Sequence, residues 1–452
     1  MRMNENRVVI TGLGVVTPVG VGITETFDAL VERRCGIHRI QSFDPSHFAS
    51  QIAGEVTGVN VKDCVPKSYR KATKVMARDI VLAVIAAYHA VKDAGLRTKC
   101  LVERGEVEGG INVDSTRFGA NIGAGLICAD LNEVTGALAT AVEHPDAPEN
   151  RAFSLLKWGN EGMSNLTPLW LLKFLPNMLA CHVTIVHDCQ APSNTITCGE
   201  ASSHLAIGEA FRTIERGAAD ICICGGAESK VNPMGLMRQS LLHRLATDAN
   251  DNPASACRPF DADRTGTVIS EGSGLIILEQ LQHAKARNAT IYAELVGFGA
   301  SANRSDWLKP QADGRALTLA ITKALADAGQ PPDAIELVNA AGVGTRAHDA
   351  SEAAAVRNVF GDRASRLPVL ATKGALGVNG AGSGAIDVAV TAMAMKRGVV
   401  PPSLNTEKVD PACGLDVVRG DPTDSHAELA VSVASALSGG QTAALVLRRF
   451  GQ

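Results

Sequence analysis

The chain has few of the features that mark a nucleic-acid-binding, membrane-spanning or secreted protein. Aromatic residues make up only 4% of the 452 residues, and 43 Lys and Arg against 47 Asp and Glu leave a formal charge of −4. Nucleic acid is bound by basic patches and aromatic stacking faces, which this composition does not supply. The longest aliphatic stretch, around 81–88, is far shorter than the roughly 20 residues of a membrane helix.

The N-terminus is a polar lead into a predicted strand at Val8–Ile10 and lacks the apolar stretch of a signal peptide. Cysteine is present without a pattern. The eleven Cys are scattered with no paired spacing, so we expect reduced, mostly buried thiols in a reducing compartment. These features together predict a cytoplasmic protein without a nucleic-acid or membrane partner.

One predicted β-run carries residues that superficially suggest zinc: Cys181, His182, His187 and Cys189. Their spacing, with no second Cys-x-x-Cys, favours ordinary packing. Cys222 and Cys224 alternate on another predicted strand, where buried thiols are the simplest interpretation. We therefore expect no metal site and no cofactor.

Short apolar runs that end at glycine alternate with amphipathic helical patterns, which is typical of an α/β fold with buried sheets. An apolar stripe predicts a helix over 74–94, and Gly95 ends it. The chain is longer than the roughly 250–300 residues at which single cores stop growing. A predicted helix that ends near Asn288, followed by a strand, places the division between 1–288 and 289–452.

The most informative stretch runs from Pro192 to Ala210 (PSNTITCGEASSHLAIGEA). A short β-run meets a helix start here, which is the geometry that exposes a side chain at a strand-to-helix elbow. The N-terminus of that helix favours negative charge. His204 lies one helical turn after Glu200, so the two side chains could contact each other. A metal or acid–base pair is one interpretation, and a hydrogen-bonded structural histidine is the other.

Besides this stretch, several short sequence blocks are informative by their order and spacing. They are VVITGLGVVTPVG (8–20), LTP (166–168), PNM (176–178), GGAE (225–228), RPFDADRTG (258–266), EG (271–272) and IYAELVGFG (291–299). In this order and at this spacing the sequence resembles the β-ketoacyl-ACP synthases, the condensing enzymes of the thiolase fold. The resemblance covers nearly the whole chain. It implies an α/β, thiolase-like, layered αβαβα fold of two similar halves, each with a mixed, mostly parallel sheet.

The chemistry of that family needs three side chains. A cysteine at the elbow carries the acyl chain as a thioester, and two histidines promote malonyl decarboxylation and stabilise the enolate. Counting from both sides of the elbow places Glu200 at the cysteine position. Ala341, in the motif at 339–343, takes the place of the first histidine, and Val378, after the Thr-Lys at 372–373, takes the place of the second. All three catalytic positions are thus degenerate.

A carboxylate cannot hold an acyl chain, because its product with a thioester is a mixed anhydride that water destroys. General acid–base groups contribute roughly 10²–10⁴-fold and oxyanion donors roughly 10²–10³-fold, so their joint loss predicts a dead condensing site. Cys198 takes the nucleophile position only if compensating gaps are placed on both sides. His348 is displaced by seven positions from Ala341, and we expect it to point elsewhere. The segment 434–441, which in the family gates the acyl pocket with phenylalanines, contains no aromatic residue.

Other family positions are retained. The resemblance implies that Asp349, Glu352 and Lys373 form a charge network that holds the two C-terminal loops, with a new catalytic role as the alternative. The segment 170–178 matches the one that reaches across the dimer axis beside the partner's pocket. Its bulky residues could limit the acyl tunnel, or they could simply pack in the core; the candidates are Phe174, Leu175, Pro176, Asn177 and Met178.

Retained scaffold with deleted chemistry suggests a non-catalytic subunit that resembles the chain-length factors. Such a subunit pairs with an active ketosynthase as a heterodimer and shapes its acyl tunnel in fatty acid, polyketide or polyene biosynthesis, meeting the acyl carrier protein through the complex. One alternative is a repurposed acyl-thioester enzyme, a decarboxylase or hydrolase, in which Glu200 acts as acid or base. The other alternative is a homodimeric acyl-binding protein.

Overall fold

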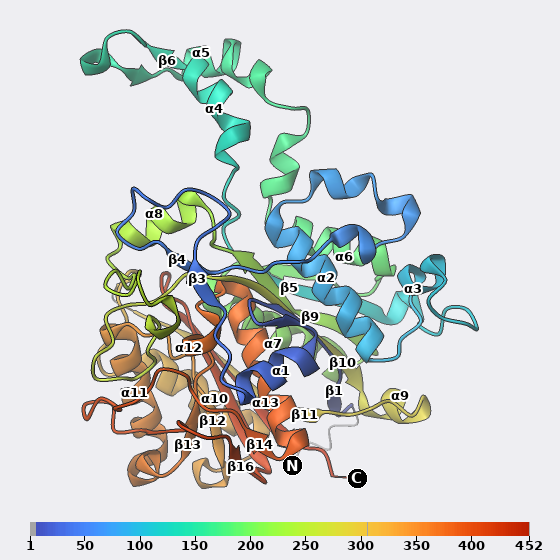
Figure 1. Cartoon of the computed structure of the whole chain (residues 1–452). Helices are drawn as coiled ribbons and strands as arrows, with labels where there is room; N and C mark the ends of the chain where they lie inside the picture. The colour runs from blue at the N-terminus through green and yellow to red at the C-terminus, as the bar shows by residue number, and fades with distance from the viewer. Residues whose placement is uncertain (1–5, 305, 452) are drawn as a thin grey trace.

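A computed structural model describes residues 6–304 and 306–451, so residues 1–5 of the polar N-terminal lead lie outside the described part (Figure 1). One large sheet runs through the molecule in the order β15-β13-β12-β17-β18-β11-β1-β10-β9-β5-β8, and β2 (Gly20–Val21) pairs with β1. In that order the strands are β15 (Asp416–Val417), β13 (Pro368–Leu370), β12 (Leu337–Asn339), β17 (Leu429–Ser435), β18 (Gln441–Arg449), β11 (Ala293–Ala302), β1 (Val8–Thr17), β10 (Glu271–Gln280), β9 (Ile221–Ser229), β5 (Phe118–Ala124) and β8 (Asn194–Ile196).

Parallel and antiparallel pairs occupy different parts of this sheet. Toward one edge β5 pairs in parallel with β8 and β9, and toward the other β12 pairs in parallel with β13 and β17. The central pairs are antiparallel, including that of β1 with β11, which joins the two halves edge to edge. Each half is therefore a mixed sheet, as expected, with its parallel pairs on the outer strands.

Helices form three layers around the two halves, in the predicted αβαβα order. α2 and α6 cover the half with β9 and β10, α7 and α13 lie between the halves, and α10 and α11 cover the other half (Figure 1). The bounds are α2 (Arg78–Asp93), α6 (Met178–His187), α7 (Ser202–Glu215), α13 (Ser383–Arg397), α10 (Arg315–Ala328) and α11 (Arg346–Phe360). The central layer carries the elbow helix α7, so the candidate site lies where the two halves meet.

The predicted helix at 74–94 is confirmed as α2, which begins at Arg78 rather than Lys74. Gly95 follows its end with a φ of +67°, a left-handed conformation that glycine adopts without strain. β1 approaches this helix closely because it lacks a side chain at Gly14. A Cβ there would lie 2.0 Å from the carbonyl oxygen of Ala86, so any larger residue would push the strand and the helix apart.

The β-run predicted around Cys181–Cys189 is wrong, because these residues form the helix α6. Val183, Thr184, Ile185 and Val186 are β-branched and favour strands by propensity. However, Leu179, Val183 and Val186 recur at helical spacing and are buried against the core cluster that also contains α2. Burial of this apolar face outweighs the weak local propensity.

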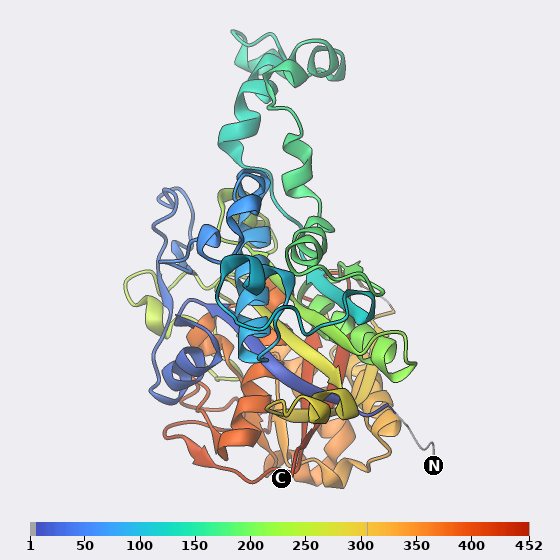
Figure 2. The same ribbon diagram turned by 90° about the vertical axis from the view of Figure 1, so that its right-hand side faces the viewer.

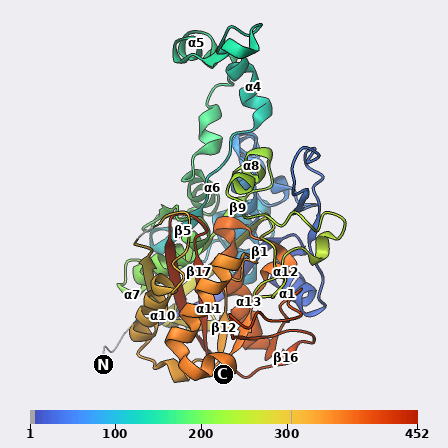
Figure 3. The same ribbon diagram turned by 90° about the vertical axis from the view of Figure 1, so that its left-hand side faces the viewer.

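A long arm, residues 126–177 between β5 and α6, stands away from the body (Figures 1, 2 and 3). It contains α4 (Leu131–Thr140), β6 (Val142–Glu143), β7 (Ala152–Phe153) and α5 (Leu155–Asn160). Its surface carries many exposed apolar side chains, and these are Leu126, Leu131, Leu138, Phe153, Leu155, Leu156, Met163, Leu169 and Leu171. An isolated protein rarely exposes so much apolar surface on one element, so the arm has the character of an interaction surface.

The remaining elements are short. They are α1 (Ile23–Val31), α3 (Lys99–Arg104), α8 (Pro233–Leu241), α9 (Leu281–Ala286), α12 (Lys373–Leu376), β3 (Ile37–Arg39), β4 (Ile52–Gly54), β14 (Val399–Val400) and β16 (Thr423–Asp424). Asn288 lies between α9 and β11, and the division into 1–288 and 289–452 stays a prediction. Within 6–304 and 306–451, every helix is too short or too polar to cross a bilayer.

Candidate functional site

Glu200 lies at the predicted connection between β8 and α7. A single 3₁₀ turn (Gly199–Ala201) joins the strand to the helix, and Gly199 adopts a φ of +56°. The elbow does not present its side chain to solvent, contrary to the prediction, because Glu200 is only 5% exposed. A buried carboxylate needs a countercharge or hydrogen bonds, since removing it from water costs several kcal/mol.

Lys230, directly after β9, supplies that countercharge. Its Nζ forms an ion pair with Oε1 of Glu200, and the backbone N–H of Leu437 donates to Oε2 at 2.7 Å. Burial by itself raises the pKa of Glu200, but Lys230 outweighs it and the net pKa is lowered. Burial likewise opposes the charge on Lys230, but Glu200 and Glu228 raise its pKa. Glu200 is therefore an ionised, paired carboxylate at neutral pH.

The three positions predicted to be degenerate, Glu200, Ala341 and Val378, line one small cavity. Its volume is about 10 Å³, close to the least that holds one water molecule. Among the described residues its lining contains neither a cysteine nor a histidine. Beside it, Ala341, Val378, Val343 and Leu437 form an apolar cluster. This cavity is too small to hold an acyl chain.

Asp349 and Glu352 hold the loop that follows β12. The amides of Ala341 and Gly342 donate to Glu352 at 2.7 and 2.9 Å, and the next two amides of the loop donate to Asp349 at 3.1 Å each. Burial raises the pKa of Asp349 to about 6 and that of Glu352 to about 7, although these hydrogen bonds lower both pKa values. The contacts fit the structural role preferred from the sequence.

Lys373 belongs to a separate pair. Its Nζ contacts Asp387 of α13 and lies 3.0 Å from Thr372 Oγ1. Burial raises the pKa of Asp387, and Lys373 partly offsets this. The hydrogen bonds of Asp349 and Glu352 and those of Lys373 thus form two sets, although the charge of Lys373 still lowers the pKa of Glu352. Sequence reasoning missed Asp387. Its signal was available, because Asp387 is the only acidic residue of helix α13 and lies in its long, mainly apolar middle part.

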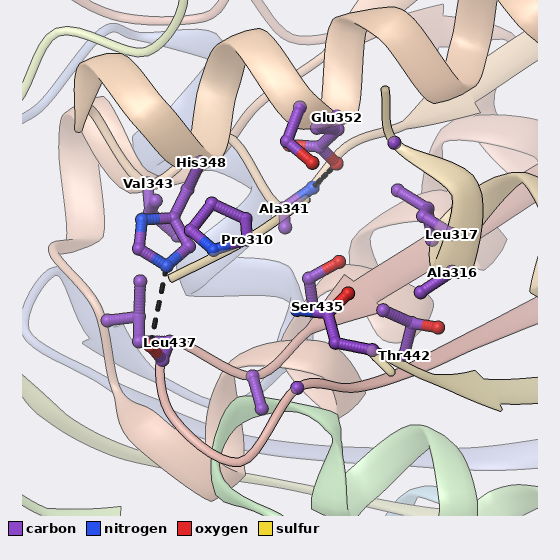
Figure 4. A pocket seen from close by; sticks show the side chains of 15 residues that line it. Pro310, Ala316, Leu317, Ala341, Val343, His348, Glu352, Ser435, Leu437 and Thr442 are labelled. Carbon is purple, nitrogen blue, oxygen red and sulfur yellow. Dashed lines mark hydrogen bonds between the residues drawn. The ribbon is translucent and has the colours of Figure 1, made fainter. Parts of the chain in front are cut away.

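His348 lies closer to the site than the sequence suggested. It lines a cavity of about 30 Å³ with Ala341 and Glu352 (Figure 4). Its Nδ1 lies 2.8 Å from Thr345 Oγ1, and its Nε2 faces the carbonyl oxygen of Leu437 at 3.4 Å. The expectation that it points elsewhere is wrong, because the first turn of α11 brings it back over the loop. Burial lowers its pKa to about 4, so it is a neutral structural histidine.

Cys198 lies outside the two cavities at the elbow. It is not among the residues that line either of these two cavities in the described part of the chain. Its backbone N–H donates to Ser202 Oγ at 2.7 Å, which fixes the turn before α7. Burial raises the pKa of its thiol, and the thiolate is the nucleophilic form.

Two family profiles cover most of the chain. The profile described as "Beta-ketoacyl synthase, N-terminal domain" matches residues 5–284, and "Beta-ketoacyl synthase, C-terminal domain" matches residues 292–407. The chain belongs to the β-ketoacyl synthase family. The resemblance inferred from the sequence blocks is confirmed.

Relatives in this ketosynthase family align along the full length. The chain is 34% identical over 449 residues to 3-oxoacyl-[acyl-carrier-protein] synthase 2 of Synechocystis sp., covering 99% of each chain. It is also 34% identical over 424 residues to the mitochondrial 3-oxoacyl-[acyl-carrier-protein] synthase of Arabidopsis thaliana, covering 90% of this chain and 86% of that one. Both relatives carry the name of a synthase.

Solved ketosynthase structures share the fold. A β-ketoacyl synthase from Burkholderia phymatum matches with a TM-score of 0.84 and 31% identity, covering 99% of this chain and 100% of that one. The ishigamide ketosynthase/chain length factor matches with a TM-score of 0.81 and 28% identity over the same shares. A type II polyketide ketosynthase in complex with its acyl-carrier protein also matches with a TM-score of 0.81 and 28% identity, covering 98% of this chain and 100% of that one. The thiolase-like α/β fold is confirmed.

Three other histidines of this ketosynthase-family chain, on α6 and α7, have structural partners. His204 is fully buried and lies 3.0 Å from Ser432 Oγ, as the structural interpretation predicted. On α6, His182 contacts the Tyr69 hydroxyl at 2.8 Å and His187 contacts Thr98 at 2.9 Å. The cysteines of the described residues are free, Cys222 and Cys224 among them, and those residues contain no cluster of metal ligands.

The segment predicted to reach a partner lies at the foot of the arm. Phe174 and Met178 are half-buried against the core cluster around α2, Leu175 and Pro176 are half-buried, and Asn177 is exposed. Phe174 also lines an open cavity of about 510 Å³ between the arm and the body. This cavity is far larger than either cavity at the elbow.

A buried acidic residue beside that cavity predicts a pH dependence. Asp79 accepts a hydrogen bond from the Ser229 amide at 3.0 Å, and burial, with a smaller effect of Glu228, raises its pKa to about 8. Because the folded pKa exceeds the unfolded value, the protonated carboxyl stabilises the fold fully below about pH 4, and this stabilisation is lost as the pH rises toward 8. The free energy of unfolding should therefore fall by at most about 1.4 kcal/mol per pH unit through the titration of this one carboxyl.

We expect Asp79→Asn to flatten the pH dependence of the unfolding free energy between pH 5 and 8, because the amide keeps an acceptor for Ser229 and does not titrate. Chemical unfolding of both proteins across this range measures the difference. Asp333→Asn, which changes a carboxylate that is 85% exposed, is the matched control. Parallel curves for wild type and Asp79→Asn would contradict the prediction.

Proposed function

We propose that this chain is a non-catalytic ketosynthase subunit that pairs with an active β-ketoacyl synthase and shapes its acyl tunnel, as a chain-length factor does. One observation carries the proposal. The cavity at the former catalytic centre is lined by Glu200, Ala341 and Val378, and it offers about 10 Å³ with neither thiol nor imidazole. Condensation needs a nucleophile that holds the acyl chain, and this site has none.

The exposed arm supports pairing with a second subunit. Leu155 and Leu156 are 78% and 74% exposed at the start of α5, and burying such side chains is worth about 1.5–3 kcal/mol each. β8 is the last strand at one edge of the large sheet, and an exposed edge strand is a template for pairing with another chain. A related solved structure is titled a ketosynthase/chain length factor, so both kinds of subunit occur on this fold.

The relatives named as synthases do not conflict with this proposal. An identity of 34% leaves most positions free to differ, and loss of catalysis needs only the few side chains that touch the substrate. The fold and its partner surface are retained by packing across the whole chain, whereas the chemistry depends on a local site.

Co-expression with a Cys-His-His ketosynthase from the same source tests the pairing. We expect the tagged chain to co-purify with it as a heterodimer, with an acyl carrier protein meeting the complex. Leu155→Asp with Leu156→Asp should abolish the co-purification, because each places a charge in an apolar contact. Leu319→Asp, which changes an exposed leucine (39%) on α10, is the matched control and should leave the complex intact. A native mass that shows only homodimers under all conditions would refute the pairing.

A further inference from the structure

The loop between β17 and β18, residues Ala436–Gly440, is tied to the rest of the site from several directions. We call it the closing loop. Two of its backbone amides donate to distant residues: Leu437 N–H to Glu200 at 2.7 Å, and Gly439 N–H to the carbonyl oxygen of Trp307 at 2.6 Å. Arg244 donates to Ser438 Oγ at 2.8 Å. His348 faces the carbonyl oxygen of Leu437 at 3.4 Å. Each contact comes from a different element, so the loop is fixed as a lid over the elbow.

The closing loop lies directly on the elbow turn. A Cβ placed on Gly199 would lie 3.4 Å from the Cβ of Ala436 and 3.7 Å from the carbonyl oxygen of Ser438. The side chain of Leu437 is only 3% exposed, and it packs with Ala341 in the apolar cluster. The loop therefore packs directly against the elbow turn.

Glu200 is the residue through which the elbow holds this loop. Its two carboxylate oxygens have different partners, Lys230 for one and the Leu437 amide for the other. A hydrogen bond to an ionised carboxylate is about twice as strong as one between neutral groups. Lys230 keeps the buried carboxylate ionised, so its ammonium strengthens the hydrogen bond between Glu200 and the Leu437 amide.

We propose that Glu200 and Lys230 form a latch that keeps the closing loop shut over the elbow, so that this subunit does not take up a carrier-borne acyl chain. Glu200 is then a positioning residue and not an acid or base. Only the statement about the acyl chain rests on the proposed function; the latch itself is a property of this chain alone. An opened loop would expose the apolar cluster to solvent, which gives the latch a stabilising role as well.

Amide hydrogen exchange of the isolated full chain, followed by mass spectrometry of overlapping fragments, tests the latch. We expect the amides of Leu437 and Gly439 to exchange about 10- to 100-fold faster in Glu200→Ala than in wild type, since that range corresponds to loss of a hydrogen bond to a charged group. Glu200→Gln keeps an oxygen that can accept from Leu437, so its increase should be smaller. The amides of β17, next to the loop, should not change.

Glu133→Gln is the matched control, because it breaks another Lys–Glu pair, with Lys173 on the arm, and does not touch the closing loop. If Glu200→Ala does not fold, the near-isosteric, neutral pair Glu200→Gln with Lys230→Met replaces it and should also speed exchange in the loop. Equal protection of Leu437 in wild type and in the variants would overturn the latch. Because no partner is present, this result does not depend on whether the heterodimer forms.

Discussion

We expect the isolated chain to condense an acyl-ACP with malonyl-ACP at least about 10⁴-fold more slowly than a ketosynthase that retains Cys-His-His. The estimate follows from the joint loss of the nucleophile and both imidazoles, since acid–base groups alone contribute roughly 10²–10⁴-fold. Glu200 cannot compensate, because Lys230 and Leu437 occupy both of its oxygens. The cavity of about 10 Å³ is far smaller than either substrate.

Mass spectrometry of the carrier-bound products measures this rate, with an active 3-oxoacyl-ACP synthase run in parallel as the control. The same samples should be scored for decarboxylation of malonyl-ACP and hydrolysis of acyl-ACP, because a repurposed enzyme would show one of these reactions. A rate in wild type that Glu200→Gln abolishes would replace the non-catalytic proposal with the acid–base alternative. In the reconstituted pair, changing the partner's nucleophilic cysteine to alanine should remove all elongation.

We expect Lys230→Met to destabilise the chain by about 3–5 kcal/mol, the cost of removing one member of a buried ion pair. The ammonium of Lys230 is the cation that neutralises Glu200, and it also lowers the pKa of Glu228, which burial raises. Methionine has a similar length but carries no charge. Two buried carboxylates would then lose the ammonium they share, leaving only the charge of Arg238 to act on Glu228 and that of Arg244 to act on Glu200.

The midpoint of chemical unfolding measures this loss, at one protein concentration so that association does not shift the result. The double variant Glu200→Gln with Lys230→Met should recover most of the stability, because a neutral pair of similar volume often replaces a buried ion pair without cost. Lys173→Met on the arm, whose pair with Glu133 is more exposed, should cost less. A single Lys230→Met variant as stable as wild type would show that the pair does not hold the site.

Much of the fold follows from local patterns. The helix at 74–94 has an apolar stripe and a glycine stop, and the structure contains it with its start displaced to Arg78. The run around His182–His187 shows the opposite case. Its β-branched residues favour a strand locally, but burial of one helical face against the cluster around α2 made it a helix. Short apolar runs are ambiguous between the two structures, and only the surface they pack against decides.

The arm was not predicted, although its residues were available. Leu155, Leu156 and Phe153 are apolar, and in a sequence such residues normally indicate a core position. Their exposure is a property of tertiary structure, because it depends on which surfaces the rest of the chain has left uncovered. The same holds for Phe174, whose half-buried place at the arm's foot became clear only with the cavity beside it.

The sequence by itself determined the family and predicted the three altered catalytic positions, because motif order and spacing are linear properties that need no coordinates. Only the tertiary structure decided which groups contact Glu200, the residue at the predicted cysteine position. Lys230 lies far from Glu200 in the chain, and Leu437 lies farther still; neither spacing nor propensity connects them. Only the packing of β9, the elbow and the closing loop brings these charges and this amide together. Buried charged and polar groups need such partners, because leaving them unpaired away from bulk solvent is costly.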